Sequence, residues 1–222
     1  MIVTGNSTDE CRRVAVFGGS FDPIHNGHVE VAEAARMENK LDRVLFVPVY
    51  KQPHRRRPPR ASGHDRLRMI ELAISEHPAF EASDCELRRR QTSYTVDTMA
   101  EIRDRLGPEP DLFFIIGSDS IVELPDWKDL SRLAALCRFI VAARPGWPLD
   151  RLDALTECLP GDYVAAMKEA AVYTTGNPVS SSEVRRRRAA GESIRGLVAE
   201  PVREYIFENG LYENCPDGYD NN

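Results

Sequence analysis

The stretch from Val14 to Val29 constrains the fold of this chain more than any other. Its first residues are apolar and rich in valine, Gly18 and Gly19 end that run, and a short loop with an Asp-Pro pair follows. A histidine pair then opens an amphipathic segment, so the pattern predicts a strand, a loop and a helix. Glycines let the backbone approach an anion closely, and the free N–H groups of a helix start favour negative charge. This junction therefore predicts a phosphate site.

Strand and helix patterns alternate along most of the chain. The first predicted helix leads to an apolar run at 43–47, which completes a βαβ unit of the kind that is almost always right-handed. The five apolar residues at 112–116 are the strongest signal for a buried strand. This order predicts an α/β fold: a Rossmann-like, doubly wound parallel sheet with helices on both faces and a small helical C-terminal part.

Residue patterns also predict the remaining elements. Ser93 or Thr95 is expected to cap the helix that begins near residue 95. Further extended segments are expected at 80–87, 138–143 and 171–175. Helices are expected at 27–39, 65–77, 95–106, 118–124, 130–136, 151–159, 180–190 and 201–208.

Length and composition indicate one globular domain. The chain has 222 residues, 42% of them hydrophobic, which is enough for one substantial core. We expect that domain at 13–212, after a flexible N-terminal extension at 1–12 and before a polar tail at 213–222. No apolar run reaches membrane-spanning length and the first twelve residues lack signal-peptide features, so the expected compartment is the cytoplasm. Five scattered cysteines fit reduced thiols better than disulfides or a zinc site.

Charge is distributed unevenly. The net charge is −6, from 35 acidic and 29 basic residues, which disfavours a general nucleic-acid binder. Arginines are nevertheless clustered at 55–60, 88–90 and 185–188. Such local positive spots suit a small phosphorylated ligand.

Ligands of doubly wound sheets bind beyond the carboxyl ends of the strands. Three loops are expected to meet at that edge, at 18–28, 48–60 and 117–119. The second of them is long for a compact domain, which is typical of a functional lid or a mobile segment.

His25 and His28 are three residues apart, so they share one face of the first helical turn. There they could donate hydrogen bonds to a phosphate and stabilise charge that develops during phosphoryl or nucleotidyl transfer. The alternative is an ordinary helix start with surface histidines, which the preceding strand and glycines make the weaker interpretation. Other phosphate and hydrolase motifs fail: the adjacent glycines do not fit G-x-G-x-x-G, and neither a P-loop nor a G-x-S-x-G elbow is present.

The segment Ser180-Ser181-Ser182-Glu183-Val184-Arg185 places hydroxyls at a helix start with an arginine one turn in. These groups could hold a triphosphate, with Arg185 as the clamp. The alternative is an ordinary cap followed by a solvated arginine face. Four successive helical positions spread around the whole circumference, so only Arg185 is taken as a ligand contact.

Three other residues have both a functional and a structural interpretation. Asp119, in Gly117-Ser118-Asp119, could bind ribose hydroxyls or a metal-bound water, or cap the next helix. Trp127 and Tyr94 could stack on an aromatic ring of a ligand, although large aromatic side chains more often belong to the core.

Taken together, these residues resemble the bacterial nicotinate-nucleotide adenylyltransferase family, within the nucleotidyltransferase superfamily that has an H/T-x-G-H signature. The signature alone indicates the superfamily, whereas Ser-Tyr-Thr and the tryptophan after the central strand point to this family. The matching motifs span most of 14–212: GGSFDPIHNGH at 18–28, PHR at 53–55, SYT at 93–95, IIGSD at 115–119 with Trp127, RPG at 144–146 and SSSEVR at 180–185.

The resemblance implies transfer of AMP from ATP to nicotinate mononucleotide, which forms nicotinate adenine dinucleotide and pyrophosphate in NAD biosynthesis. In the family, the phosphate of the mononucleotide attacks the α-phosphorus of ATP directly and in line. Mg²⁺ is implied as the cofactor, held mainly by the ATP phosphates and water rather than by a protein metal site. ATP and nicotinate mononucleotide are the expected partners, with no nucleic acid and no membrane. A homo-oligomer is an open alternative to a monomer.

The resemblance also implies roles for individual residues. Ser20 and Ser182 stand where threonine is commoner in the family, and both keep a hydroxyl. The catalytic residues would be His25, His28 and Arg185. ATP would contact Gly18, Gly19, Ser20, Phe21, Gly117, Asp119, Arg144, Ser181 and Ser182. Nicotinate mononucleotide would contact His54, Tyr94, Thr95 and Trp127.

The sequence is compatible with two alternative functions. The first is a related nucleotidyltransferase that acts on nicotinamide mononucleotide or pantetheine phosphate. The acid and the amide mononucleotide differ by one negative charge, and backbone N–H groups near Tyr94 would suit the carboxylate. The second is a nucleotide sensor without turnover, which the presence of both histidines and Arg185 disfavours.

Overall fold

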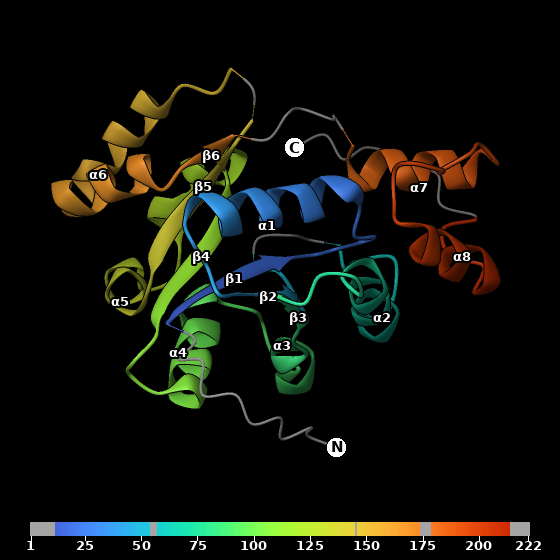
Figure 1. Ribbon diagram of the computed structural model, residues 1–222, viewed down its shortest axis with the longest axis horizontal. Coiled ribbons are helices and arrows are strands. Elements are labelled where there is room, and N and C mark those ends of the chain that lie inside the picture. The colour runs from blue at the N-terminus through green and yellow to red at the C-terminus, as the bar shows by residue number, and fades with distance from the viewer. Residues whose placement is uncertain (1–11, 54–56, 145, 174–178, 214–222) are drawn as a thin grey trace.

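Six parallel strands form one sheet in the order β3-β2-β1-β4-β5-β6 (Figure 1). This computed structural model describes residues 12–53, 57–144, 146–173 and 179–213. The strand order runs outward in both directions from the β1–β4 pair, which confirms the doubly wound sheet and places its switch point between these two strands. The strands are β1 (Arg13–Gly19), β2 (Arg43–Pro48), β3 (Phe80–Ala82), β4 (Asp111–Gly117), β5 (Arg138–Ala143) and β6 (Val172–Tyr173).

Helices cover both faces of the sheet. Figure 1 shows α1 across one face and α3 and α4 on the other. The helices are α1 (Asn26–Glu38), α2 (Gly63–Ala73), α3 (Cys85–Arg89), α4 (Thr95–Leu106), α5 (Leu130–Leu136), α6 (Gly161–Glu169), α7 (Ser181–Ala189) and α8 (Glu200–Glu208). Two 3-10 helices occupy Ser118–Asp126 and Leu149–Glu157.

The core is divided into two layers by the sheet. Successive side chains of a strand point to opposite faces, so in β1 Ala15 and Phe17 join the layer that contains α1, α2, α7 and α8. Val14 and Val16 join the layer that contains α3, α4, α5 and α6. Both faces of the central strands are buried, which explains why their sequences are continuous apolar runs rather than alternating ones.

Local structure differs from the expectations at several places. The helix expected at 65–77 begins at Gly63, because the Ser62 hydroxyl caps it by accepting from the Asp65 N–H at 3.1 Å, and it ends at Ala73. The extended segment expected at 80–87 ends at Ala82 and gives way to α3. The segment expected as a helix at 118–124 lies in the first 3-10 helix, and the one expected at 151–159 overlaps the second, which ends at Glu157.

Helix α6 was not expected from the sequence. It begins at Gly161 after Pro160, with no side-chain cap, and it buries only Val164 and Met167. A glycine at the start and two apolar positions leave little periodic signal.

The expected N-terminal extension and polar tail lie outside the described residues apart from Arg12 and Glu213. The Arg12 N–H donates to Asp42 Oδ2 at 2.8 Å, and Glu213 forms an ion pair with Arg188. Cys85, Cys137 and Cys158 are free thiols. In the part of the chain that the structure describes, no helix is both long and apolar enough to span a membrane.

Candidate active site

Gly18 and Gly19 end β1 at the switch point between β1 and β4, and their lack of side chains lets aromatic rings pack closely against the backbone. A Cβ on Gly18 would lie 3.2 Å from the Phe114 ring, and one on Gly19 would lie 3.1 Å from the Phe21 ring. Phe21 is fully buried at a positive φ of 45° and packs edge-on against Phe17, with ring centroids 5.5 Å apart. The Phe21 side chain therefore shapes the turn, and only its backbone is left to contact a ligand.

The two histidine rings stack on each other at the start of α1. Their centroids are 3.7 Å apart and their planes differ by 25°. The His25 backbone N–H donates to Nδ1 of His28 at 3.2 Å, so the proton of a neutral His28 sits on Nε2. A Cβ on Gly27 would lie 3.2 Å from the His25 ring. The glycine between the histidines is what allows this ring to fold back over the helix start.

Burial keeps both imidazoles neutral in the protein without ligand. It lowers the pKa of His25 to about 4. The pKa of His28 is also lowered well below its ordinary value, first by burial and then by the neighbouring His25 charge. Each ring can therefore offer one N–H to a ligand at neutral pH, as a hydrogen-bond donor rather than as a cation.

Asp22 ties the phosphate turn to two distant segments. It is 4% exposed, and its Oδ1 accepts from the Ala61 N–H at 3.0 Å and from the Tyr212 hydroxyl at 2.8 Å. Its Oδ2 accepts from the Arg60 N–H at 2.6 Å. Burial and the Asp22 charge raise the pKa of Tyr212, so this hydroxyl keeps its proton and acts as the donor.

Arg66, on α2, is the buried cation beside this carboxylate. It is 2% exposed, and its guanidinium donates to the carbonyls of Ser20 at 2.7 Å, Val49 at 2.7 Å and Ala61 at 3.3 Å. The loops after β1 and β2 are thus held by one side chain. Sequence patterns missed Arg66, because it sits within an ordinary helical repeat whose partners are far away in the chain.

The start of α7 closes over the same turn. The Ser181 hydroxyl donates to the Pro23 carbonyl at 2.8 Å. Arg185 is 8% exposed and donates to the Asp22 carbonyl at 2.8 Å and to the Ser182 hydroxyl at 3.0 Å. Arg186 instead forms an ion pair with Glu183 on the outer face of the helix. Of the four successive arginines, Arg185 is the one turned toward the histidines' turn.

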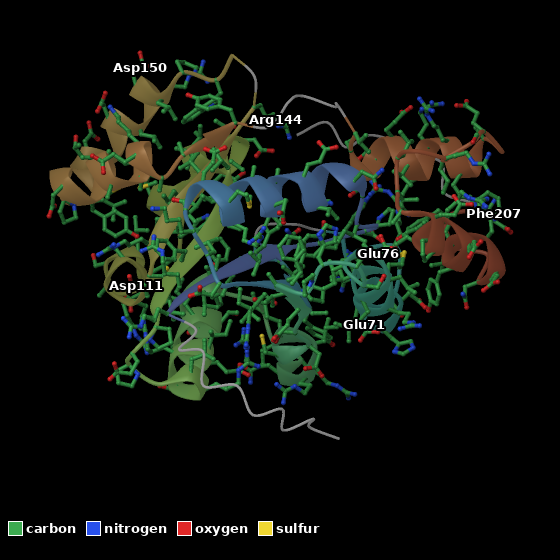
Figure 2. All side chains as sticks on the ribbon, viewed as in Figure 1. Glu71, Glu76, Asp111, Arg144, Asp150 and Phe207 are labelled. Atoms are coloured by element: carbon green, nitrogen blue, oxygen red, sulfur yellow. The ribbon has the colours of Figure 1, made fainter. Side chains whose placement is uncertain are left out.

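Asp119 and Arg144 lie together at the carboxyl ends of β4 and β5. Arg144 Nη2 and Asp119 Oδ2 are 3.0 Å apart, and both side chains are mostly exposed. Figure 2 places Arg144 and Asp111, the first residue of β4, near opposite ends of the neighbouring strands β5 and β4. Asp119 Oδ1 lies 2.5 Å from where a Cβ on Gly117 would be. The carboxylate folds back over Gly117 and makes no side-chain cap for the helix that follows.

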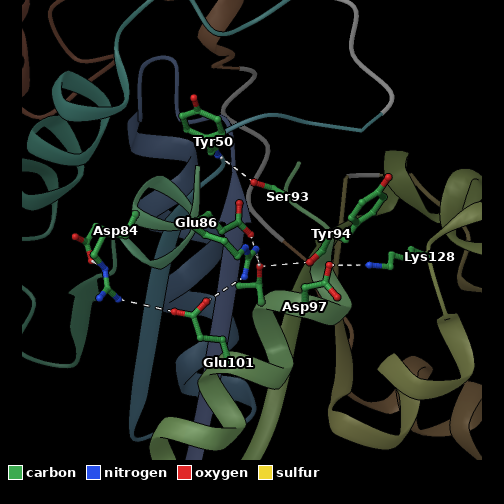
Figure 3. Close-up of polar contacts among 11 residues, drawn as sticks. Tyr50, Asp84, Glu86, Ser93, Tyr94, Asp97, Glu101 and Lys128 are labelled. Atoms are coloured by element: carbon green, nitrogen blue, oxygen red, sulfur yellow. Dashed lines mark hydrogen bonds and ion pairs between the residues drawn. The ribbon is translucent and has the colours of Figure 1, made fainter. Parts of the chain in front are cut away.

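Tyr94 and Trp127 are partly buried and pack against the core layer that contains α4 and α5. Trp127 is half-buried and packs edge-on against Phe114 at 5.9 Å between ring centroids. The ammonium of Lys128 lies 4.5 Å from the Tyr94 ring centroid and 2.8 Å from Asp97 Oδ2 (Figure 3). Trp127 is therefore partly a core residue and partly accessible to a ligand, while His54 lies outside the described residues.

Helix α4 begins without a side-chain cap, so the expectation that Ser93 or Thr95 caps it is wrong. Tyr94 occupies the N-cap position in an extended conformation and makes no capping hydrogen bond. The Ser93 hydroxyl is engaged elsewhere, since it accepts from the Tyr50 N–H at 3.1 Å. Among the described residues, the backbone N–H groups of Thr95 and Val96 donate no hydrogen bond. This leaves donors of the kind that a helix start presents to an anion.

The described residues contain no group of three or more His, Cys, Asp and Glu side chains that could hold a metal ion.

A phosphate turn with stacked imidazoles at the switch point of a doubly wound sheet defines a nucleotide-binding α/β protein. A family model described as cytidylyltransferase-like matches residues 16–187.

Relatives narrow the family further. "Probable nicotinate-nucleotide adenylyltransferase" of Moorella thermoacetica is 42% identical over 208 residues, which cover 93% of this chain and 94% of the relative. A relative of the same description from Treponema pallidum is 36% identical over 91% of this chain and its own full length. The fold is similar to that of Plasmodium falciparum nicotinic acid mononucleotide adenylyltransferase complexed with NaAD, with a TM-score of 0.68 at 19% identity, over 92% of this chain and 98% of that one. The chain belongs to the nicotinate-nucleotide adenylyltransferase family of cytidylyltransferase-like proteins.

The buried Asp22 carboxylate yields a stability prediction. We expect Asp22→Asn to lower the free energy of unfolding by about 3 kcal/mol, because an amide cannot accept from all three donors and leaves Arg66 without its buried counter-charge. The measurement is urea unfolding followed by circular dichroism. The control is Asp104→Asn, an exposed carboxylate, which should change stability by less than about 0.5 kcal/mol. Equal stability of the two variants would contradict the role given to Asp22.

The lowered pKa of His25 yields a prediction about pH. The value of about 4 in the folded state lies below the ordinary value of 6.5, so unfolding takes up a proton between these two pH values. The free energy of unfolding should therefore fall as the pH decreases from 6.5 toward 4. Denaturant unfolding across this range should show a shallower dependence for His25→Gln than for the unmodified protein. Identical slopes would show that His25 titrates normally.

Proposed function

We propose that this chain transfers the adenylyl group of ATP to nicotinate mononucleotide and releases pyrophosphate. The observation that carries the proposal is the stacked His25–His28 pair, which presents a neutral Nε2–H of His28 at the phosphate turn while the start of α7 faces the same turn. The family of the chain supports the same reaction. We further propose that residues 13–212 make up the nucleotidyltransferase domain and that the enzyme works in the cytoplasm.

The ATP half of the cleft consists of the phosphate turn, α7 and the ends of β4 and β5. We assign the triphosphate to the backbone at 18–21, the histidine pair and the α7 start. The Ser182 hydroxyl accepts from Arg185, so its own proton is left to donate to a phosphate oxygen. We assign the adenosine side to Gly117, Asp119 and Arg144, where the ion pair between the last two must open or rotate for a ribose to bind.

The mononucleotide half lies around the start of α4. Among the described residues the half-buried Thr95 offers a backbone N–H that donates no hydrogen bond. Such a donor at a helix start suits a carboxylate better than a neutral amide, because the helix dipole adds to the hydrogen bond for a negative group. Trp127 and Tyr94 supply aromatic surface for the nicotinate ring. We keep His54 as a candidate contact with nicotinate mononucleotide, on the basis of the family resemblance of the PHR motif at 53–55 alone.

The reaction needs positioning and charge stabilisation rather than a protein nucleophile. An oxygen of the mononucleotide phosphate forms a bond to the α-phosphorus while the bond from that phosphorus to the bridging oxygen breaks, and pyrophosphate leaves with the electron pair. The imidazole N–H groups hold the phosphate oxygens on which charge accumulates, and Arg185 fixes the turn and the Ser182 hydroxyl. Mg²⁺, bound through the nucleotide phosphates, would supply further charge neutralisation.

A comparison of acceptors tests the substrate. With ATP and Mg²⁺, pyrophosphate release should be fastest with nicotinate mononucleotide, because only this acceptor brings a carboxylate to the α4 start. Nicotinamide mononucleotide and pantetheine phosphate are measured in parallel by a coupled pyrophosphate assay. A rate with either that equals or exceeds the rate with the acid would contradict the assignment, and no release with any acceptor would indicate a nucleotide sensor.

A histidine substitution tests the site. We expect His28→Ala to lower kcat by roughly 10²–10³-fold, the usual effect of removing a transition-state hydrogen-bond donor. His64→Ala, at an exposed position on α2, is the matched control and should retain full activity. Circular dichroism of both variants checks that they fold. A folded His28→Ala protein with near-normal turnover would remove His28 from the catalytic residues.

A further inference from the structure

A buried carboxylate underlies the start of α4. Glu86, on α3, is 5% exposed, and its Oε1 accepts from the Thr98 hydroxyl at 2.6 Å. Arg89 donates to the same hydroxyl at 2.8 Å and pairs with Glu101 at 3.0 Å on the outer side (Figure 3). The Glu86 carboxylate is thus linked to α4 by a hydrogen bond that it accepts from the Thr98 hydroxyl. The guanidinium of Arg89 lies close by and balances the charge.

Ser93 lies on the other side of Glu86. Its N–H donates to the Lys51 carbonyl at 2.8 Å and its hydroxyl accepts from the Tyr50 N–H at 3.1 Å, so Ser93 is held in strand-like pairing with the exit of β2. Burial raises the pKa of Glu86, while the nearby hydroxyls of Ser93 and Thr98 and the Arg89 charge act in the opposite direction. Glu86 Oε2 is buried and has no hydrogen-bond partner among the described residues within bonding distance.

These contacts fix which residue occupies the N-cap position of α4. Serine is among the favoured N-cap residues and tyrosine is not, so a shift of the helix start by one residue would let Ser93 cap the helix. Two sets of contacts oppose that shift. Ser93 is bonded to the residues that follow β2, and Thr98 is bonded to Glu86, so both sides of the Ser93-Tyr94-Thr95 turn are held. The first N–H groups of α4 therefore stay open.

We infer that Glu86 is a positioning residue that keeps the α4 start uncapped and thereby favours the acid mononucleotide over its amide. The inference rests on the proposed function, since it concerns the carboxylate site assigned to α4. Its role does not require contact with substrate. It acts through its hydrogen bond with Thr98, on the half of the proposed cleft that does not hold ATP.

The test is a set of steady-state constants with three ligands. For Glu86→Ala, the KM for nicotinate mononucleotide should rise about tenfold, the loss expected for one to two charge-assisted hydrogen bonds. The KM for ATP should stay within about twofold, and the preference in kcat/KM for the acid over the amide should fall at least fivefold. Thr98→Val, which removes the linking hydroxyl at constant shape, should shift the same constants in the same direction and serves if Glu86→Ala does not fold.

Glu101→Ala is the matched control. It removes the other carboxylate on Arg89 and is half-exposed, so all three constants should stay at their unmodified values. An unchanged KM for nicotinate mononucleotide in both Glu86→Ala and Thr98→Val would overturn the inference, as would an equal rise in the KM for ATP, which would indicate a general structural role. Failure of the proposed function is distinguishable, because the unmodified protein would then show no preference for the acid.

Discussion

The candidate site depends on the burial of one negative charge, that of Asp22, inside the turn that is to hold a more strongly charged ligand. A buried carboxylate is costly unless its oxygens are satisfied and its charge is balanced. Here donors from residues 60, 61 and 212 satisfy it, and the buried Arg66 lies close enough for the two charges to interact. The turn after β1, the loop after β2 and the last described segment of the chain are therefore held in one arrangement before any substrate binds.

The same burial determines how the histidines can work. A charged imidazole pair would bind phosphate more strongly in the ground state, but two stacked cations repel each other and lose their hydration in this turn. Neutral rings avoid that cost and still present N–H groups in fixed orientations. Stabilisation by oriented neutral donors requires no rearrangement during the reaction. In the proposed site the cationic group is Arg185, which is itself fixed by its hydrogen bond to the Asp22 carbonyl.

Local patterns predicted most of the fold, and long-range contacts explain most of what they missed. The apolar runs of β2, β4 and β5 and the spacing of α1, α4 and α5 matched the structure closely because burial of a strand or a helix face leaves a periodic signal. Helix geometry indicated that the four arginines at 185–188 could not all face one ligand, and in the structure Arg185 is turned toward the turn after β1. The roles of Asp22 and Arg66 could not be predicted, since their partners lie about 40 residues or more away in the chain for several contacts. Helix α3 was missed because it is short and is held by a buried polar network.

The two halves of the cleft are built on different principles, which follows from what each is to bind. The proposed ATP half carries hydroxyls, imidazoles and an arginine, because a triphosphate offers many oxygens and tolerates several donor geometries. The proposed mononucleotide half relies on the backbone N–H at the start of α4, which in our proposal is kept uncapped by the contacts of Ser93 with Tyr50 and of Thr98 with Glu86. Discrimination between an acid and an amide of equal shape cannot come from packing. It requires donors that are left open for a charge, and a helix start can stay open only if the neighbouring serine is held away from the cap position.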